Sequence, residues 1–374
     1  MPLRDLIAAR IRARGPITVA AFMDLALYHP QSGYYATAPQ RSGQAGDFFT
    51  SVDVGSIFGE LLAVQFAEMW RLAGFPARCD LVEAAASNGR LARDVLDGAQ
   101  ADDPDFYAAI ALHLVETSAA ARGAQRETLG PHAAKLASGG DSLPTGITGV
   151  IFANELLDAL PVHLVVMRED GLKEVHVGER NGELVAVEGP PSTPEIAAYL
   201  ARVGATLGPG CLAEVNLAAE AWVARAARSL AKGFLVIIDY GRDAAELYSG
   251  AHANGTLRSF RHHATDPAPA GWLADPGERD ITAHVDLTGV RLAAERENLV
   301  TLAALDQTYL LLGLGLADRL SRGTGDPVAD LKRRLAAKTL LVPGGMGSTH
   351  KALIFGKNVG TPRLTCTSFK VRLT

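Results

Sequence analysis

Hydrophobic residues recur along this chain with two spacings that alternate. Apolar residues three or four positions apart, with helix start signals, predict helices in residues 3–14, 19–27, 56–71, 91–96, 119–129 and 217–232. Short apolar runs predict buried strands in residues 79–83, 110–116, 134–137, 149–154, 234–240 and 351–355. Repeated strand–helix units favour a mainly parallel, doubly wound α/β sheet.

Two regions depart from this alternation. In residues 162–190, the turn signals Asp170-Gly171 and Asn181-Gly182 separate stretches of alternating hydrophobic and polar residues. This pattern predicts an antiparallel meander inserted between the strand–helix units. Residues 241–286 are rich in His, Pro, Gly and Asp, which predicts a long loop.

We expect two regions along the chain, an N-terminal helical segment over residues 1–75 and a sheet core over residues 76–374. A leucine-rich stretch at 305–320 is expected to be a core helix or a dimer face, so a homodimer is an open possibility. Its most apolar part, 309–317, is about half of the ~20 residues that a membrane helix needs. No membrane contact is therefore expected.

Composition excludes several classes of protein. With 48% hydrophobic and 21% charged residues among 374, the chain has the composition of a globular protein and not of a disordered or collagen-like one. The formal net charge of -5 argues against a nucleic-acid partner. Cys79, Cys211 and Cys366 are widely separated and have neither a zinc spacing nor the pattern of a disulfide framework, which predicts a reducing, cytoplasmic location and no metal.

Acidic residues stand at the ends of most predicted strands. They are Glu83, Glu116, Asp141, Glu155 and Asp239. Ligands of an open α/β sheet bind beyond the carboxyl ends of its strands. The chain lacks the G-x-G-x-x-G and Walker A patterns, so these acids suit a ligand with hydroxyls, amines or a cationic centre better than a phosphate-rich one. The alternative for any one of them is a helix cap or a solvated surface acid.

Several blocks carry a more specific signal. In chain order they are Gly33-Tyr34-Tyr35, residues 46–51 (GDFFTS), 58–61 (FGEL), 114–118 (LVETS), 153–162 (ANELLDALPV), 238–241 (IDYG) and 275–286 (DPGERDITAHVD). Together they resemble the MidA (DUF185) family of S-adenosyl-L-methionine-dependent methyltransferases, which includes a mitochondrial protein arginine methyltransferase. The resemblance covers most of residues 16–356. It implies a class I Rossmann-like core.

The chain departs from that family in its glycine loop. The family pattern Glu-x-Gly-x-Gly-x-Gly is here Glu83 to Gly89, with Ala85 and Ser87 in place of two glycines. Glycine allows positive φ and close approach of backbone to ligand. Alanine and serine are the smallest replacements, and Asn88 tolerates a left-handed conformation. We therefore expect a weakened loop that still binds, in a divergent member of the family.

The resemblance implies a site for S-adenosyl-L-methionine. Glu83, Ala85, Ser87 and Gly89 would hold its methionine end, Glu116 and Thr117 its ribose, Asp141 and Ser142 its adenine, and Asn154 would face the methyl centre, with Gly46, Asp47 and Thr50 folding over it.

Glu155 and Asp158 are the candidate catalytic residues. Three residues apart after a strand, they would share a face of a first helical turn. The resemblance implies methyl transfer to an N or O acceptor, which is either a small molecule of a biosynthetic pathway or a protein arginine. The alternative function is a degenerate, non-catalytic protein that binds S-adenosyl-L-methionine or assists assembly.

Overall fold

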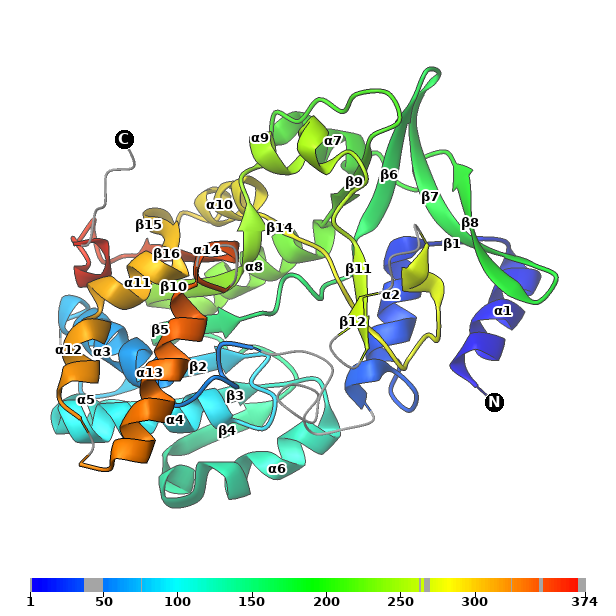
Figure 1. Ribbon diagram of the computed structural model, residues 1–374. Coiled ribbons are helices and arrows are strands. Elements are labelled where there is room, and N and C mark those ends of the chain that lie inside the picture. Colours follow the sequence, from blue (N-terminus) through cyan, green and yellow to red (C-terminus); the bar gives the residue numbers. More distant parts are fainter. Residues whose placement is uncertain are drawn as a thin grey trace. The chain divides into compact units, whose positions relative to one another are not determined.

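The computed structural model describes residues 2–36, 50–74, 76–261, 264–265, 270–323, 325–342 and 346–368. Its chain forms two compact units (Figure 1). The first consists of Met1–Phe48, Leu157–Val223 and Gly241–Ala293, and the second of Phe49–Leu156, Ala224–Tyr240 and Ala294–Thr374. Each unit is made of segments that are separate in the sequence, whereas the predicted regions 1–75 and 76–374 are each continuous. The predicted division at residue 75 stays a prediction.

The second unit is built on a sheet with the strand order β15-β16-β10-β5-β2-β3-β4. The strands are β2 (Cys79–Ala84), β3 (Ile110–Val115), β4 (Leu136–Gly140), β5 (Ile147–Asn154), β10 (Leu230–Arg242), β15 (Val300–Asp306) and β16 (His350–Lys357). From β10 to β4 all neighbours are parallel, while β16 is antiparallel to both of its neighbours. The predicted parallel α/β sheet is confirmed.

Helices of the second unit pack on this sheet. They are α3 (Ile57–Leu72), α4 (Arg90–Asp102), α5 (Pro104–Ala109), α6 (Ala119–Leu129), α11 (Gln307–Gly313), α12 (Leu316–Ser321), α13 (Pro327–Leu341) and α14 (Met346–Thr349), with short turns η2 (Gly130–Lys135) and η5 (Thr365–Thr367). Leu310 and Leu311 on α11 are fully buried, so the leucine-rich stretch belongs to the core, as one of its two predicted roles requires.

The close packing of α3 on α4 depends on glycine. A Cβ added to Gly59 would lie 2.6 Å from the Cβ of Asp94, and one added to Gly98 would lie 2.8 Å from the Cα of Glu60. Neither glycine has a side chain, so the two helix backbones approach closely. This contact fixes α4, whose first turn follows the predicted glycine loop.

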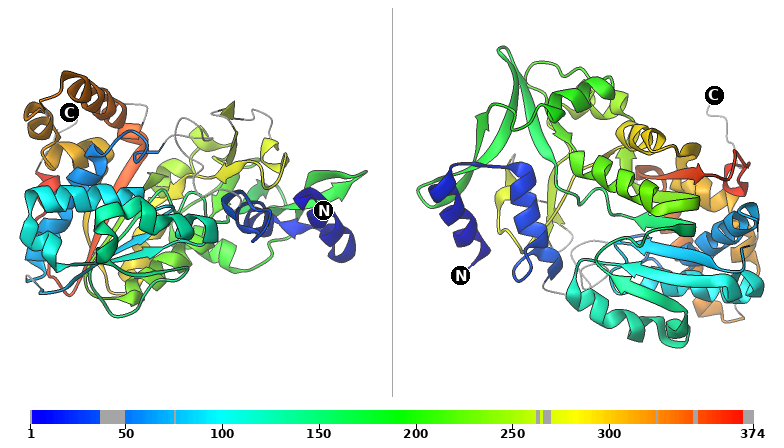
Figure 2. Two further views of the ribbon diagram at one scale, coloured as in Figure 1. Left: turned by 90° about the horizontal axis from the view of Figure 1, so that it is seen from below. Right: turned by 180° about the vertical axis from the view of Figure 1, so that it is seen from behind.

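The first unit contains the predicted meander as β6 (His163–Arg168), β7 (Gly171–Arg180) and β8 (Glu183–Gly189). Strands β1 (Ile17–Thr18) and β9 (Leu212–Val215) complete this antiparallel sheet. The helices α1 (Leu3–Arg14) and α2 (Val19–Tyr28) lie beside it (Figure 2). Thr18 caps α2, because its hydroxyl accepts from Ala21 N at 3.1 Å.

Residues 241–286 are more ordered than the sequence predicts. Instead of one long loop, the first unit holds short elements here: α9 (Ala244–Leu247), η3 (Gly250–His252), β11 (Arg258–Arg261), β12 (Ala264–Thr265), η4 (Gly271–Leu273), β13 (Asp280–Thr282) and β14 (Val285–Asp286). β12, β11 and β13 form a small sheet. The remaining elements are η1 (Tyr34–Ala36) and α7 (Glu195–Arg202), with α8 (Leu217–Ser229) and α10 (Leu287–Arg296) having residues in both units. Glycine and proline residues lie between these short elements, and their high frequency in the sequence favours the prediction of a loop.

The predicted helix over 217–232 is three residues too long. α8 ends at Ser229, and β10 begins at Leu230, which pairs with Ile147 of β5. Gly233 lies inside β10, where an added Cβ would be 1.9 Å from the carbonyl oxygen of Gly149. Close approach of two backbones in the sheet therefore explains this glycine. Strand β15 was not predicted at all.

Candidate active site

The loop between β2 and α4 has the backbone of a glycine loop although two of its glycines are absent. The φ angles of Ala85, Ser87 and Gly89 are 56°, 47° and 86°, all in the left-handed region. Backbone hydrogen bonds fix the turn, from Ala86 N to Val115 O (3.1 Å) and from Gly89 N to Ala86 O (2.8 Å). The left-handed positions are thus those of the replaced glycines, and Asn88 is not among them. Each non-glycine residue in this region costs about 1–2 kcal/mol.

Restoring the glycines is expected to stabilise the fold. Ala85→Gly and Ser87→Gly each relieve about 1–2 kcal/mol of backbone strain in the folded state. Each also lowers the free energy of unfolding by about 0.4–1 kcal/mol, because glycine makes the unfolded chain more flexible. The net gain per residue is about 0.5–1 kcal/mol, measurable by urea unfolding. Ala86→Gly is the matched control, since Ala86 lies outside the left-handed region and should lose stability when replaced. A loss of stability in Ala85→Gly and Ser87→Gly would contradict the strained-loop account.

Glu83 is the last residue but one of β2 and lies near the first turn of α4. It is 4% exposed. Burial raises the pKa of its carboxyl well above the ordinary value, the N–H of Ala92 opposes this shift, and the charges of Asp94 and Glu116 add to it. Its Oε2 has no hydrogen-bond partner among the described residues. A buried carboxyl oxygen without a partner is costly, so this position calls for a cation or a donor from a ligand.

Glu116 joins the ends of β2 and β3. Its Oε2 accepts from Ser87 N at 2.9 Å, and its Oε1 accepts from Ser118 N at 2.7 Å. Ser118 in turn caps α6, since its hydroxyl accepts from Ala121 N. Oε1 also accepts from the Thr117 hydroxyl at 3.4 Å. Oε2 keeps a further acceptor site, and the residue is half-buried. Glu116 therefore both supports the loop and can accept hydroxyl hydrogen bonds.

The other predicted cofactor residues lie at the same edge of the sheet or just before it. Thr117 follows Glu116 and is exposed, as are Asp141 and Ser142 after β4. The bond from Glu116 N to Gly140 O (2.8 Å) brings the ends of β3 and β4 together. Gly46 and Asp47 lie outside the described residues.

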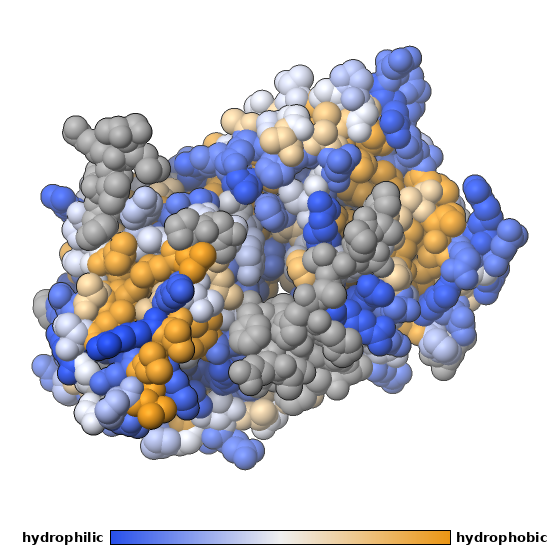
Figure 3. Space-filling model, in the orientation of Figure 1, coloured by the Kyte–Doolittle hydropathy of each residue, from blue (hydrophilic) through white to orange (hydrophobic). Residues whose placement is uncertain are grey.

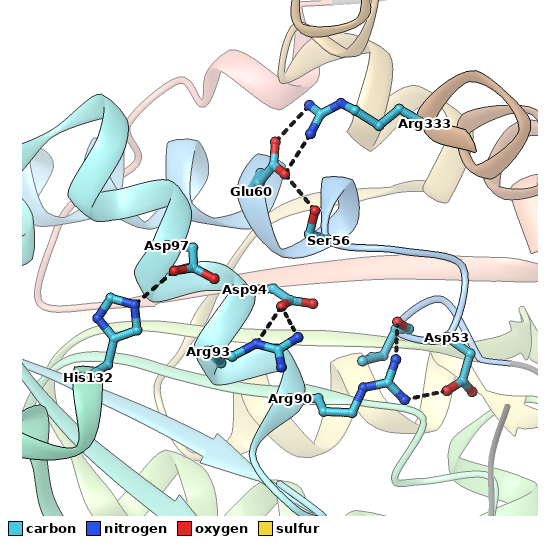
Figure 4. A network of polar contacts seen from close by, with 10 residues as sticks. Asp53, Ser56, Glu60, Arg90, Arg93, Asp94, Asp97, His132 and Arg333 are labelled. Carbon is cyan, nitrogen blue, oxygen red and sulfur yellow. Dashed lines mark hydrogen bonds and ion pairs between the residues drawn. The ribbon is translucent and has the colours of Figure 1, made fainter. Parts of the chain in front are cut away.

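Thr50 has a local partner. Its N–H and its hydroxyl both donate to Asp53 Oδ2, at 3.1 and 3.0 Å. Asp53 also pairs with Arg90, the first residue of α4, at 2.8 Å (Figure 4). Asp53 and Arg90 thus tie the segment that starts at Thr50 to the end of the glycine loop. Arg90 was not predicted, because it belongs to no recognised motif.

Glu155 stands at the end of β5 in a strained conformation. Its φ is 53°, and its N–H donates to Ile238 O at 2.8 Å. Its Oε1 accepts from Ser51 N (3.2 Å) and from Asn154 Nδ2 (3.1 Å). Asn154 Oδ1 is buried without a hydrogen bond among the described residues. Left-handed non-glycine residues cluster at functional sites, where the surroundings hold them in place.

His350, the first residue of β16, was not predicted and lies against Glu155. It is fully buried, with Nε2 3.5 Å from Glu155 Oε1 and Nδ1 3.1 Å from Met346 O. A carbonyl only accepts, so Nδ1 is the donor to Met346 O. Nε2 has no hydrogen-bond partner among the described residues and lies beside the Glu155 carboxylate.

Asp158 does not share a helical face with Glu155. The residues after β5 form bends and turns instead of a helix, because Glu155 itself is left-handed and Pro161 follows shortly. Glu155 belongs to the second unit and Asp158 to the first. Asp158 is buried there, and its carbonyl accepts from Ala283 N at 2.9 Å. The helical spacing expected for this pair was wrong.

Comparison with known proteins identifies the family. Residues 61–305 match the profile of a family described as "Putative S-adenosyl-L-methionine-dependent methyltransferase". The chain belongs to this family. Among its relatives, the Drosophila melanogaster mitochondrial protein arginine methyltransferase NDUFAF7 homolog is 31% identical over 94% of this chain and 84% of its own. The Danio rerio mitochondrial protein arginine methyltransferase NDUFAF7 is 29% identical over 84% of this chain and 76% of its own.

A solved structure supports the same family. A Burkholderia thailandensis protein with bound S-adenosyl-homocysteine has a TM-score of 0.88 and 30% identity, over 98% of this methyltransferase and 94% of that chain. The predicted family, class I fold and cofactor are thereby confirmed, and the chain is a S-adenosyl-L-methionine-dependent methyltransferase. None of the helices in the described ranges is long and apolar enough to cross a membrane.

The residues present in the second unit fit S-adenosyl-L-methionine. Glu83 offers an unpartnered buried oxygen to a cationic group, the left-handed loop lets backbone come close, and Glu116 keeps acceptor capacity for a diol. When bound, S-adenosyl-L-methionine supplies an electrophilic methyl group on its sulfonium. The assignment of single residues to parts of the cofactor stays a prediction.

The role of Glu116 can be tested against its structural contacts. Glu116→Ala should weaken S-adenosyl-L-methionine binding by about 1–3 kcal/mol, through lost charge-assisted hydrogen bonds. It should also lower the melting temperature, because Ser87 N and Ser118 N lose their acceptor. Ser118→Ala is the control, as it removes only the α6 cap, worth about 1 kcal/mol of stability. If both variants lose stability and keep the wild-type dissociation constant, Glu116 is structural only.

Proposed function

We propose that this methyltransferase transfers its methyl group to an arginine guanidinium of a protein, with Glu155 on the acceptor side. The observation that carries the proposal is the place of Glu155 at the carboxyl end of β5, where ligands of such sheets bind. Its backbone is left-handed, and its side chain is 9% exposed. The relatives named protein arginine methyltransferases support the choice of acceptor. Asp158 stays a second candidate catalytic residue.

The chemistry of the acceptor explains why a carboxylate is needed. A guanidinium is always charged in proteins and its nitrogen lone pairs are delocalised. A carboxylate that accepts its N–H bonds orients one nitrogen and takes the proton that this nitrogen loses on methylation. Among the described residues, the hydrogen bonds that the Glu155 carboxylate accepts all go to Oε1, which leaves Oε2 for the methyl acceptor. Alignment and exclusion of water supply the rest of the rate.

A peptide assay tests the proposal. Tritiated S-adenosyl-L-methionine would be incubated with the enzyme and an arginine-containing peptide, with the same peptide carrying lysine instead of arginine as the control. Label on the arginine peptide alone is the expected result. Label on a small-molecule N or O acceptor and on no peptide would favour a biosynthetic methyltransferase. Cofactor binding without transfer to either class would favour the degenerate, non-catalytic alternative.

The contact of His350 with Glu155 gives a further test. Asparagine in place of His350 can donate to Met346 O from the position of Nδ1, whereas glutamine can donate to Glu155 from the position of Nε2. If His350 positions Glu155, His350→Asn should lower kcat about tenfold through misplacement of the carboxylate, and His350→Gln should stay near wild type. Both should keep the wild-type affinity for S-adenosyl-L-methionine. Equal kcat values in the two variants would show that His350 only packs.

The cytoplasmic location remains a prediction from the sequence. Burial raises the pKa of the Cys79 and Cys366 thiols to about 12, so these cysteines are unreactive, and the described structure contains them as free thiols. The relatives are named mitochondrial. Fractionation of cells that express a tagged full chain distinguishes the two compartments.

A further inference from the structure

Helix α13 carries an unusual share of exposed apolar side chains. Val328, Leu331 and Leu335 are 61%, 58% and 55% exposed, and Val342, which follows the helix, is 40% exposed. The described part of the chain exposes two further large apolar residues, Leu72 on α3 and Val300 on β15. Figure 3 shows hydrophobic and strongly hydrophilic residues side by side over α13. Such a concentration on one helix marks an interaction surface.

The spacing of these residues is that of a coiled-coil seam. Positions 328, 331, 335, 338 and 342 follow each other at intervals of three, four, three and four, with Lys338 as the polar member. The opposite face of α13 packs on its own unit, since Ala336, Ala337 and Leu340 are buried. Arg333 on that face pairs with Glu60 at 3.0 Å (Figure 4). The seam, which we define as Val328, Leu331, Leu335, Lys338 and Val342, is therefore turned away from the core.

The charges beside the seam decide what can cover it. Lys332 and Arg334 flank it on its two sides, and both are exposed, as is Lys338 within it. Two copies of α13 laid together would bring these basic residues opposite each other, which disfavours a homodimer through this face. Acidic residues on a partner helix would pair with them.

The width of the seam argues against a membrane. A helix that lies in a lipid interface has a broad apolar face, and a stripe limited to positions a and d is the narrower seam of a coiled coil. Here basic residues border the apolar stripe directly on both sides. The net charge of -5 also repels the whole chain from an anionic surface.

We propose that α13 docks an amphipathic helix of another protein, one with apolar residues at its a and d positions and Asp or Glu beside them. The seam spans about two heptads, so the contact is small and transient by the standards of protein interfaces. Its flanking charges speed association and select the partner. The proposal is independent of the methyl acceptor and of Glu155.

Two synthetic peptides test this proposal. Both are fluorescein-labelled three-heptad helices with Leu at positions a and d; one has Glu at positions e and g, and the other has Lys there. Fluorescence anisotropy at low salt is expected to show at least tenfold tighter binding of the Glu peptide to the wild-type enzyme. The double variant K332E/R334E should reverse this preference, and Leu331→Ser with Leu335→Ser should weaken the Glu peptide at least tenfold.

The controls separate the seam from general charge and from unfolding. Arg225→Glu reverses an exposed charge on α8 and should leave peptide binding unchanged. All variants should keep the circular dichroism spectrum and the S-adenosylhomocysteine affinity of the wild type. Equal binding of both peptides, no binding of either, or an unchanged preference in K332E/R334E overturns the proposal. A dimer seen by sedimentation in the wild type and lost in L331S/L335S would also overturn it. So would binding to phosphatidylglycerol vesicles that L331S/L335S abolishes.

Discussion

Glu155→Gln is expected to lower methyl transfer by roughly 10²-fold or more, the contribution of a positioned general base. The amide cannot take the proton that the acceptor nitrogen loses, although it has almost the same shape. Affinity for S-adenosyl-L-methionine should stay at the wild-type value, because Glu155 is predicted to meet the acceptor and not the cofactor. The initial rate of tritium transfer to the arginine peptide and a calorimetric titration measure the two quantities.

A matched substitution makes this result specific. Glu127→Gln removes an exposed carboxylate from α6 and should change neither quantity. Asp158→Asn tests the second predicted residue, and a loss of turnover at unchanged cofactor affinity would place it on the acceptor side as well. Wild-type turnover in Glu155→Gln would mean that the acceptor is activated by another group or by proximity alone.

Glu83→Gln is expected to weaken S-adenosyl-L-methionine about tenfold to 10²-fold, since a charge-assisted hydrogen bond contributes about 1.5–3 kcal/mol. The wild-type affinity should also rise with pH. Burial holds the pKa of Glu83 well above its ordinary value of 4.5, and a cationic ligand favours the ionised carboxylate. Binding therefore releases a proton, and this pH dependence should be absent in Glu83→Gln.

The stability of the free protein should move in the opposite direction. A carboxyl whose pKa is raised on folding contributes its full stability below its unfolded value, and that contribution is lost as pH rises toward the folded value. Glu83→Gln has no carboxyl that must stay neutral in the fold, so it should melt at the same or a higher temperature than the wild type at pH 7.

Calorimetric titrations with S-adenosyl-L-methionine at pH 6, 7 and 8, in two buffers of different ionisation enthalpy, measure the proton release on binding. Identical release by wild type and variant would contradict the role of Glu83.

Periodicity predicted the elements that depend on local residues. The helices over 3–14 and 119–129 have the predicted bounds, because their apolar positions lie within each segment and Gly15 and Gly130 follow directly at their ends. β10 begins earlier than predicted, since its pairing with β5 decides where it starts. β15 was not predicted, because its pairing partner β16 lies far from it in the sequence. Tertiary pairing, which one sequence does not show, set these boundaries.

The candidate site also combines features that local sequence predicts with features that tertiary pairing decides. The acids at strand ends follow from sequence, because a parallel sheet gathers its strand ends at one edge. The left-handed positions of the loop lie at Ala85 and Ser87, where the family pattern has glycine, and not at Asn88. His350 was missed, since a histidine that begins an apolar strand has no motif; only the register Tyr240 opposite His350 brings it to the same edge. The expected helical face of Glu155 and Asp158 failed because φ at Glu155 is positive.

Calorimetric titration of the wild-type enzyme with S-adenosylhomocysteine tests the central claim most directly. The claim is that the loop at Ala85 and Ser87 keeps the backbone of a glycine loop and a working cofactor site beside Glu83 and Glu116. The account predicts one site per chain, with Ala85→Gly/Ser87→Gly binding as tightly or more tightly. No heat and no rise in melting temperature at millimolar S-adenosylhomocysteine would contradict it.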